Sequence, residues 1–190
     1  MWKRVRYEVR RAWWHLRQKL HLGAQYVTIT WARVTNGQVG LVSQLSARKW
    51  TPETGWVDLG VLGRRCVTNV LANILVDCFQ SGASGLTDIT TFKYHKVGTG
   101  TTAEDVTDTA LETPTGEAAM TGTQVEGSGA NVYRSVATYT CTVSGGAEIT
   151  EHGLFNFYDK LMDRTVFSAT SMSVGNELEF TYELTVVVGG

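Results

Sequence analysis

The sequence predicts a mainly β fold, an antiparallel β-sandwich or jelly-roll-like body of about eight strands, with one buried helix and an amphipathic helix at the N-terminus. The 190 residues include twenty glycines but only two prolines. Threonine and valine, which favour strands, are abundant. Several segments alternate apolar and polar residues, as strands with one buried face do. A chain of this length is long enough to bury a core of its own.

Charge divides the chain into a basic arm, residues 1–22, and an acidic β-rich domain, residues 23–190. The arm carries seven Lys or Arg and one acid, whereas the rest carries ten basic and seventeen acidic residues. We expect hairpins and a helix over residues 23–90 and the sandwich over 91–190. No apolar run of about 18 residues exists, so no transmembrane span is expected. No apolar segment precedes a small-residue cleavage site, so no signal peptide is expected either.

The arm is predicted to form an amphipathic helix from Trp2 to Leu22 that ends at Gly23. Its apolar residues fall within a stripe of about 100°. Three roles are open: packing on the protein's own body or a sister subunit, docking of the basic face on an acidic neighbour, and adsorption to an anionic membrane or nucleic acid. The partner-binding candidates on this helix are Trp2, Arg6, Arg10, Trp13, Trp14 and Arg17.

Residues 25–62 are predicted to form strands at 25–34, 39–50 and 56–62. Asn36-Gly37 signals a hairpin between the first two strands, and Pro52 with Gly55 forms the next turn. Trp and Arg are enriched at protein interfaces, although a Trp near a strand end equally often closes a core. The partner-binding candidates on these strands are Trp31, Arg48, Trp50 and Trp56.

A helix is predicted from Thr68, as N-cap, to Gln80. Asn69, Asn73 and Asp77 form its polar side. The opposite, apolar face is expected to pack on the sheet and consists of Val70, Leu71, Ile74, Leu75, Cys78 and Phe79. The cysteines at 66, 78 and 141 show no CxxC spacing, so we expect small buried apolar side chains in a protein assembled in a reducing cytoplasm.

A strand at 91–97 leads into a Gly-Thr-Gly loop. A phosphate-binding loop would continue into a helix through a Lys and a Ser or Thr, but acidic, Thr-rich sequence follows here. A divalent-cation site at Glu104, Asp105 and Asp108 is a minor alternative. The preferred interpretation is a long connection in which Ala110 and Leu111 re-enter the core. We expect no metal and no cofactor, and we expect residues 112–129 to form a surface loop or flexible edge.

Two of the remaining strands are predicted at 131–144 and 177–188. Between them we expect a hairpin that spans 149–167 and whose second arm covers 164–169. Gly145-Gly146 and Asp159-Lys160 mark the turns. Adjacent strand residues point to opposite faces, so Glu151 and His152 cannot act on one substrate. No other catalytic motif is present, so no enzymatic activity and no small-molecule substrate are expected.

Three segments carry a resemblance to a known family. They are the Gly-Thr-Gly loop leading to Asp-Thr-Ala-Leu within Val97–Leu111, the run ITEHGLF at 149–155, and the strand LMDRTVF at 161–167. Together they resemble a group of tailed-bacteriophage virion proteins, over the C-terminal half and the helix before it. The resemblance implies a virion structural protein, assembled in the host bacterial cytoplasm, that binds other virion proteins in many copies as a homo-oligomer.

Placement within the particle stays open. A capsid decoration or cement protein, bound to the major capsid protein, comes first because an anchoring arm on a compact body suits a subunit that bridges a shell. A tail, baseplate or fibre-attachment protein comes second, since the ITExGLF hairpin is similar to segments in the particle-proximal domains of tail fibres. A membrane- or nucleic-acid-binding module comes third. The basic arm is not part of the motifs that carry the resemblance.

Overall fold

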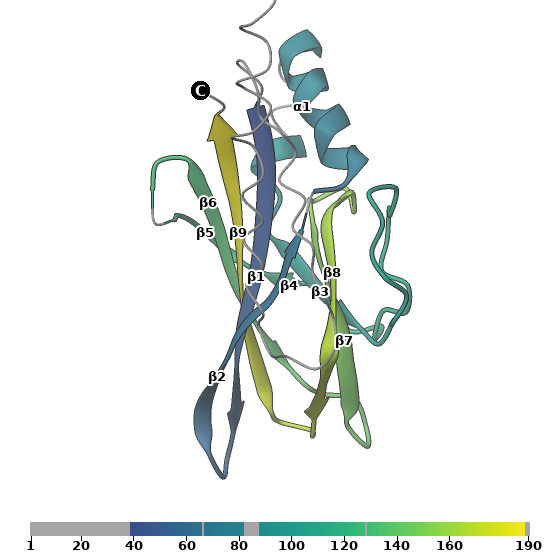
Figure 1. Cartoon of the computed structure of the whole chain (residues 1–190). Helices are drawn as coiled ribbons and strands as arrows, with labels where there is room; N and C mark the ends of the chain where they lie inside the picture. The colour runs from purple at the N-terminus through teal and green to yellow at the C-terminus, as the bar shows by residue number, and fades with distance from the viewer. Residues whose placement is uncertain (1–38, 66, 82–87, 128, 189–190) are drawn as a thin grey trace, which may run out of the picture. The chain divides into compact units, whose positions relative to one another are not determined.

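The computed structural model describes residues 39–65, 67–81, 88–127 and 129–188 (Figure 1). Within them, nine strands form two antiparallel sheets that face each other, which confirms the mainly β fold. The five-stranded sheet has the order β2 (Gly55–Arg65), β1 (Val39–Thr51), β9 (Glu177–Val188), β6 (Val132–Thr140) and β5 (Thr123–Glu126). The four-stranded sheet has the order β4 (Met120–Thr121), β3 (Tyr94–Gly98), β7 (Ala147–Phe155) and β8 (Leu161–Met172).

Strand β9 lies at the centre of the five-stranded sheet and confirms the predicted alternation. Leu178, Phe180 and Tyr182 are fully buried on its inner face. Its outer face carries acids that pair across strands, because Glu179 accepts both guanidinium bonds of Arg48 on β1 and Glu183 those of Arg134 on β6. One face therefore packs on the core while the other carries charge.

The core lies between the two sheets. The five-stranded sheet contributes Leu45, Phe180 and Tyr182, and the four-stranded sheet contributes Leu154 and Phe167. Each of these side chains is at most 6% exposed. Apolar burial of this extent is the main favourable term of folding, and it fixes which faces of the strands turn inward.

The turns follow the sequence signals. Gly55 in the β1–β2 turn and both glycines of Gly145-Gly146 have positive φ angles, 67°, 86° and 87°, which glycine adopts without steric cost. Asp159 in the β7–β8 turn has φ 63°. The second arm of that hairpin is longer than predicted, since β8 runs over Leu161–Met172.

Helix α1 (Asn69–Ser81) confirms the helix predicted at 68–80. The main-chain amide of Ala72 donates to the Thr68 carbonyl, which places Thr68 at the N-cap position. Its hydroxyl, however, donates to the Leu161 carbonyl and ties the helix to β8. The expectation that Phe79 packs on the sheet is wrong, because this ring is 89% exposed. α1 is thus buried on one side only.

Two further expectations need correction. Residues 112–129 are not simply a loop, since β4 pairs with β3 and β5 pairs with β6. These short strands lie at sheet edges with much of their surface in solvent, so they lack a marked apolar alternation. Ala110 is exposed, whereas Leu111 is buried, so only the latter re-enters the core.

Other expectations lie outside the described residues: the arm at 1–22, the strand at 25–34 with its Asn36-Gly37 turn, and Cys66. Over residues 43–50, β1 is already paired on both edges, to β2 and to β9. Cys141 is fully buried, as expected, and Cys78 is partly buried. Among the described helices, none is long and apolar enough to cross a membrane.

Candidate functional site

The three motifs that carry the family resemblance meet at a buried ion pair. Glu151 on β7 is fully buried, and Arg164 on β8 is 5% exposed. The Arg164 Nε–H donates to Glu151 Oε2 over 2.8 Å. Both side chains lie on the outer side of the four-stranded sheet, under the loop of residues 99–113. We name this pair and its loop contacts the Glu151–Arg164 clamp.

Glu151 holds the loop through main-chain amides. Its carboxylate accepts hydrogen bonds from Gly100 (3.2 Å), Glu112 (3.0 Å) and Thr113 (2.7 Å). A Cβ atom at Gly98 or Gly100 would lie 2.3 or 2.7 Å from Glu151 Oε1. The Gly-Thr-Gly motif is therefore required for close approach to a carboxylate, and not to a phosphate.

Arg164 holds the loop from the other side. Its terminal nitrogens donate to Asp108 (3.1 Å), to Glu112 (3.3 Å) and to the Thr102 carbonyl (3.2 Å). Burial disfavours the charged guanidinium, but the hydrogen bonds to Glu151 and Asp108 outweigh this effect and raise the pKa of Arg164. The guanidinium thus stays charged and joins two strands to the loop.

The loop acids that sequence reasoning considered for a cation have protein partners. Asp108 pairs with Arg164, and Asp105 accepts from the amide and hydroxyl of Thr107, bonds that lower the pKa of Asp105. In the part of the chain that the structure describes, no group of three or more His, Cys, Asp or Glu side chains is placed to hold a metal ion. These carboxylates stabilise the loop.

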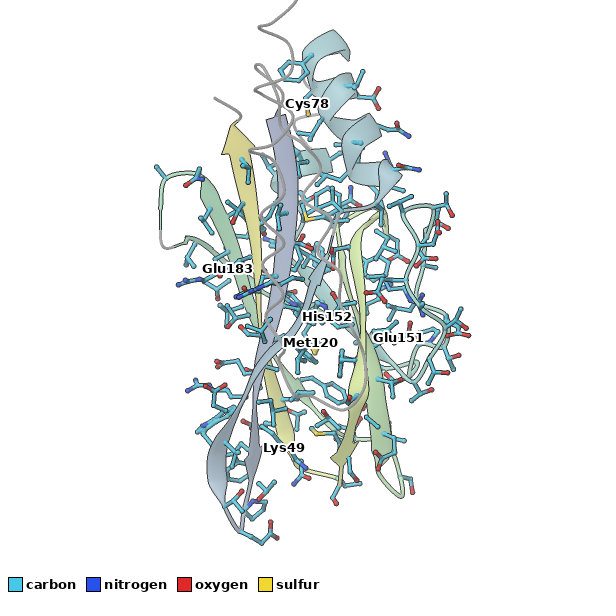
Figure 2. The ribbon with its side chains drawn as sticks, in the orientation of Figure 1. Lys49, Cys78, Met120, Glu151, His152 and Glu183 are labelled. Carbon is cyan, nitrogen blue, oxygen red and sulfur yellow. The ribbon has the colours of Figure 1, made fainter. Side chains whose placement is uncertain are left out.

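On the opposite side of β7, His152 points into the core, as Figure 2 shows for the labelled Glu151 and His152. His152 Nε2 lies 2.8 Å from His95 Nδ1 on β3, and His95 Nε2 lies 2.8 Å from Ser135 Oγ on β6. The His152 ring also packs on Phe180, with ring centroids 4.6 Å apart. This polar chain connects the four-stranded sheet to the five-stranded sheet.

Both histidines are neutral in the folded protein. Burial lowers the pKa of His95 to about 3 and, together with the neighbouring His95, lowers the pKa of His152 well below its usual value. Because two neutral imidazoles share one hydrogen bond, one of them donates and the other accepts. His152 Nδ1 is buried and has no hydrogen-bond partner among the described residues.

The order Ser135, His95, His152 matches that of a nucleophile, a base and an orienting group. All three side chains, however, are fully buried. Gly122 closes the approach, since a Cβ there would lie 2.5 Å from Ser135 Oγ and 2.8 Å from His95 Nε2. In the described part of the chain the Ser135 hydroxyl is therefore closed off from solvent, and the three residues form a polar link between the sheets.

A second polar link crosses the core at Asp163 on β8, which is 1% exposed. Its carboxylate accepts hydrogen bonds from Ser43 on β1 (2.6 Å) and from Thr165 (2.9 Å). A Cβ at Gly63 on β2 would lie 2.5 Å from Thr165 Cγ2, so β2 and β8 approach closely here. The Asp163 and histidine links fix how the sheets face each other.

Three of the predicted partner-binding residues come together on the outer face of the β1–β2 hairpin. The Arg48 guanidinium lies 4.4 Å from the centroid of the Trp56 ring and donates to both carboxylate oxygens of Glu179. Trp56 is 42% exposed, and Trp50 lies opposite it across the hairpin. Beside them is a shallow hollow of about 360 Å³ lined by Ser46, Ala47, Arg48, Trp56, Asp58, Glu179 and Thr181.

The hydrogen bonds to Glu179 raise the pKa of Arg48, so this cation is already paired. An interface role for the three residues stays a prediction. The other candidates lie outside the described residues: Trp2, Arg6, Arg10, Trp13, Trp14, Arg17 and Trp31.

Sequence reasoning missed a second exposed aromatic pair, in the β7–β8 turn. Phe157 is 67% exposed and Tyr158 is 55% exposed. Asn156 holds the turn, because its side-chain oxygen accepts from the amides of Tyr158 and Lys160. The available signal was two aromatic residues between an Asn and an Asp, since a turn places such rings in solvent.

We predict that Arg164→Met strongly destabilises the protein. The variant leaves the buried Glu151 charge without its ion partner, and breaking a buried pair in this way costs roughly 3–5 kcal/mol. Urea unfolding of the full chain measures the loss. The control is Arg48→Met, which removes the exposed Arg48–Glu179 pair and should reduce stability far less. Equal losses in the two variants would contradict a central role for the clamp.

We also predict that acid weakens the protein through the histidine pair. The unfolded histidines bind protons below a pH of about 6.5, whereas the folded ones do not, so the free energy of unfolding decreases as the pH falls below 6.5. A folded pKa of about 3 for His95 corresponds to a loss of about 2 kcal/mol by pH 5. Urea unfolding at pH 7, 6 and 5 measures it.

The matched variants for this pH series are His152→Gln and His21→Gln. The first removes part of the decrease between pH 7 and pH 5, and the second, outside the described residues, retains it. A decrease that is the same in wild type and His152→Gln would show that the pair does not cause it.

Comparisons with models of protein families, with curated proteins and with solved structures found no match to this chain. A function must therefore be inferred from the residues and from the geometry described above. That geometry consists of a loop clamped by a buried ion pair, two polar links through the core, and exposed aromatic and arginine side chains.

Proposed function

We propose that this protein is a structural subunit of a tailed-bacteriophage particle. The observation that carries the proposal is the convergence of the three motif segments on the Glu151–Arg164 clamp. The Gly-Thr-Gly loop lies 51 residues before Glu151, whereas the ITEHGLF and Asp-Arg-Thr strands are the two arms of one hairpin, and each of the three segments supplies a part of the clamp. The dependence of all three motif segments on one ion pair supports the proposal.

The chemistry of the described residues supports a binding role over a catalytic one. The clamp acids have partners within the loop, and the serine and histidine groups are sealed in the core. The groups that reach solvent include the aromatic rings of Trp56, Phe157 and Phe79 and the paired Arg48. Side chains of these types concentrate binding energy at protein interfaces.

Our first placement is the capsid exterior, where the protein decorates the shell as a cement protein and binds the major capsid protein in many copies. The basic arm at 1–22 supplies an anchor, and the acidic domain supplies a compact body. The second placement is the tail, baseplate or fibre attachment. The β7–β8 hairpin favours it, because the segment similar to the particle-proximal domains of tail fibres ends in a turn that exposes Phe157 and Tyr158.

The number of copies per particle tests the proposal. Quantitative mass spectrometry of purified particles should detect the chain at a ratio near one, or near one half, to the major capsid protein if it decorates the shell. A ratio of a few per cent would favour the tail and overturn the first placement. Absence from washed particles would overturn the proposal itself.

The role of the arm is tested by deleting residues 1–22. If the arm anchors the protein, the deleted chain should fold but fail to bind particles that lack the wild-type protein. A peptide of residues 1–22 tests the third role. Binding to anionic liposomes or DNA that weakens steeply with salt would favour a membrane or nucleic-acid partner, and no binding at low salt would exclude it for the arm.

A further inference from the structure

Helix α1 has a wider apolar surface than its own body covers. Eight of its thirteen residues are apolar. At 100° per residue they span an arc of about 240°, whereas a helix that lies on one surface needs an arc of little more than about 100°. A helix with apolar residues around most of its circumference is normally covered on more than one side.

The body buries only one part of this arc. Leu71 is 1% exposed and Ile74 is 2% exposed, and Leu75 and Cys78 pack partly against the same core. Figure 1 shows α1 at one end of the body, with its C-terminal half extending beyond the strands. The neighbouring part of the arc faces solvent and consists of Ala72, Val76 and Phe79. We name these three residues the α1 stripe.

The α1 stripe is continuous and uncharged. Its residues are spaced four and then three apart, so they line up along one side of the helix. Val76 is 51% exposed and Phe79 is 89% exposed. Asp77 is the one charged residue of α1, and it lies with Asn69 and Asn73 on the polar side. Val76 and Phe79 thus form a small exposed apolar patch along one side of the helix.

We infer that a second copy of this chain covers the α1 stripe, with the two α1 helices packed antiparallel about a two-fold axis near Val76. The residue one turn before Val76 is the small Ala72, and the residue one turn after it is the large Phe79. In an antiparallel pair, the Phe79 ring of each helix lies opposite Ala72 of the other. The stripe is therefore self-complementary in size, as a two-fold interface requires.

The charges permit this arrangement. Neither Asp77 nor any other charged residue of α1 lies on the stripe, so two stripes can meet without burying a charge. The helices can approach to about 8–10 Å because Ala72 adds little bulk. Two short stripes bury less than the roughly 1,200 Å² of a stable interface, so the free protein associates weakly and high concentration favours the dimer. This inference stands independently of the proposed function.

Sedimentation velocity of the full chain over a concentration series tests the pairing. Wild type should shift from one copy toward two as its concentration rises to about 500 µM. Phe79→Lys should remain at one copy, because two lysines would have to be buried against apolar side chains. The matched control is Phe157→Lys, which changes another exposed phenylalanine, 67% exposed and away from α1, and should associate like wild type.

Cross-linking tests the two-fold axis directly. Val76→Cys should form a disulfide-linked dimer on mild oxidation, whereas Asn73→Cys, on the polar side of the same helix, should not exceed the background from the native cysteines. Circular dichroism confirms that each variant is folded. A wild type that stays at one copy, association that persists in Phe79→Lys, or equal cross-linking at positions 73 and 76 would each overturn the inference.

Discussion

The buried pair of Glu151 and Arg164 is the interaction on which the outer half of the molecule depends. Apolar burial between the two sheets needs no help from it, but the loop at 99–113 offers only Leu111 to an apolar contact. Main-chain amides of that loop therefore bond to Glu151, and its acids bond to Arg164. Each charge offsets the desolvation cost of burying the other, because burying either charge alone in this position would cost free energy. The arrangement converts a polar loop into an ordered cover for the four-stranded sheet.

The sequence allowed prediction of the elements whose signal is local. The alternation of Leu178, Phe180 and Tyr182 identified β9 within its observed bounds, and Gly145-Gly146 and Pro52 located turns. It did not allow prediction of β4 and β5, because edge strands are defined by what they pair with. Phe79 was misplaced for a related reason, since the period of a helix shows an apolar arc but not how much of the arc the body covers.

The polar contacts in the core could not be predicted from local sequence patterns either. The opposite orientation of Glu151 and His152 followed from strand geometry, yet the contact of His152 with His95 depends on the register of β3 against β7. The same holds for Asp163 and Ser43, which come from strands more than a hundred residues apart. A different arrangement of the sheets would leave more of these buried groups without partners, which costs free energy. The polar contacts between the sheets therefore favour one relative orientation of the two sheets over others that apolar packing alone would allow.

The charged outer face of β9 bears on how the chain selects its strand pairing during folding. A slip of two residues between β6 and β9 would keep every apolar side chain on the inner face, so the hydrophobic pattern cannot reject it. It would, however, move Arg134 from Glu183 to Thr181 or Thr185. This partly buried surface pair distinguishes the native register from its nearest competitors. On this central strand, charged surface residues therefore help to specify the register of strand pairing.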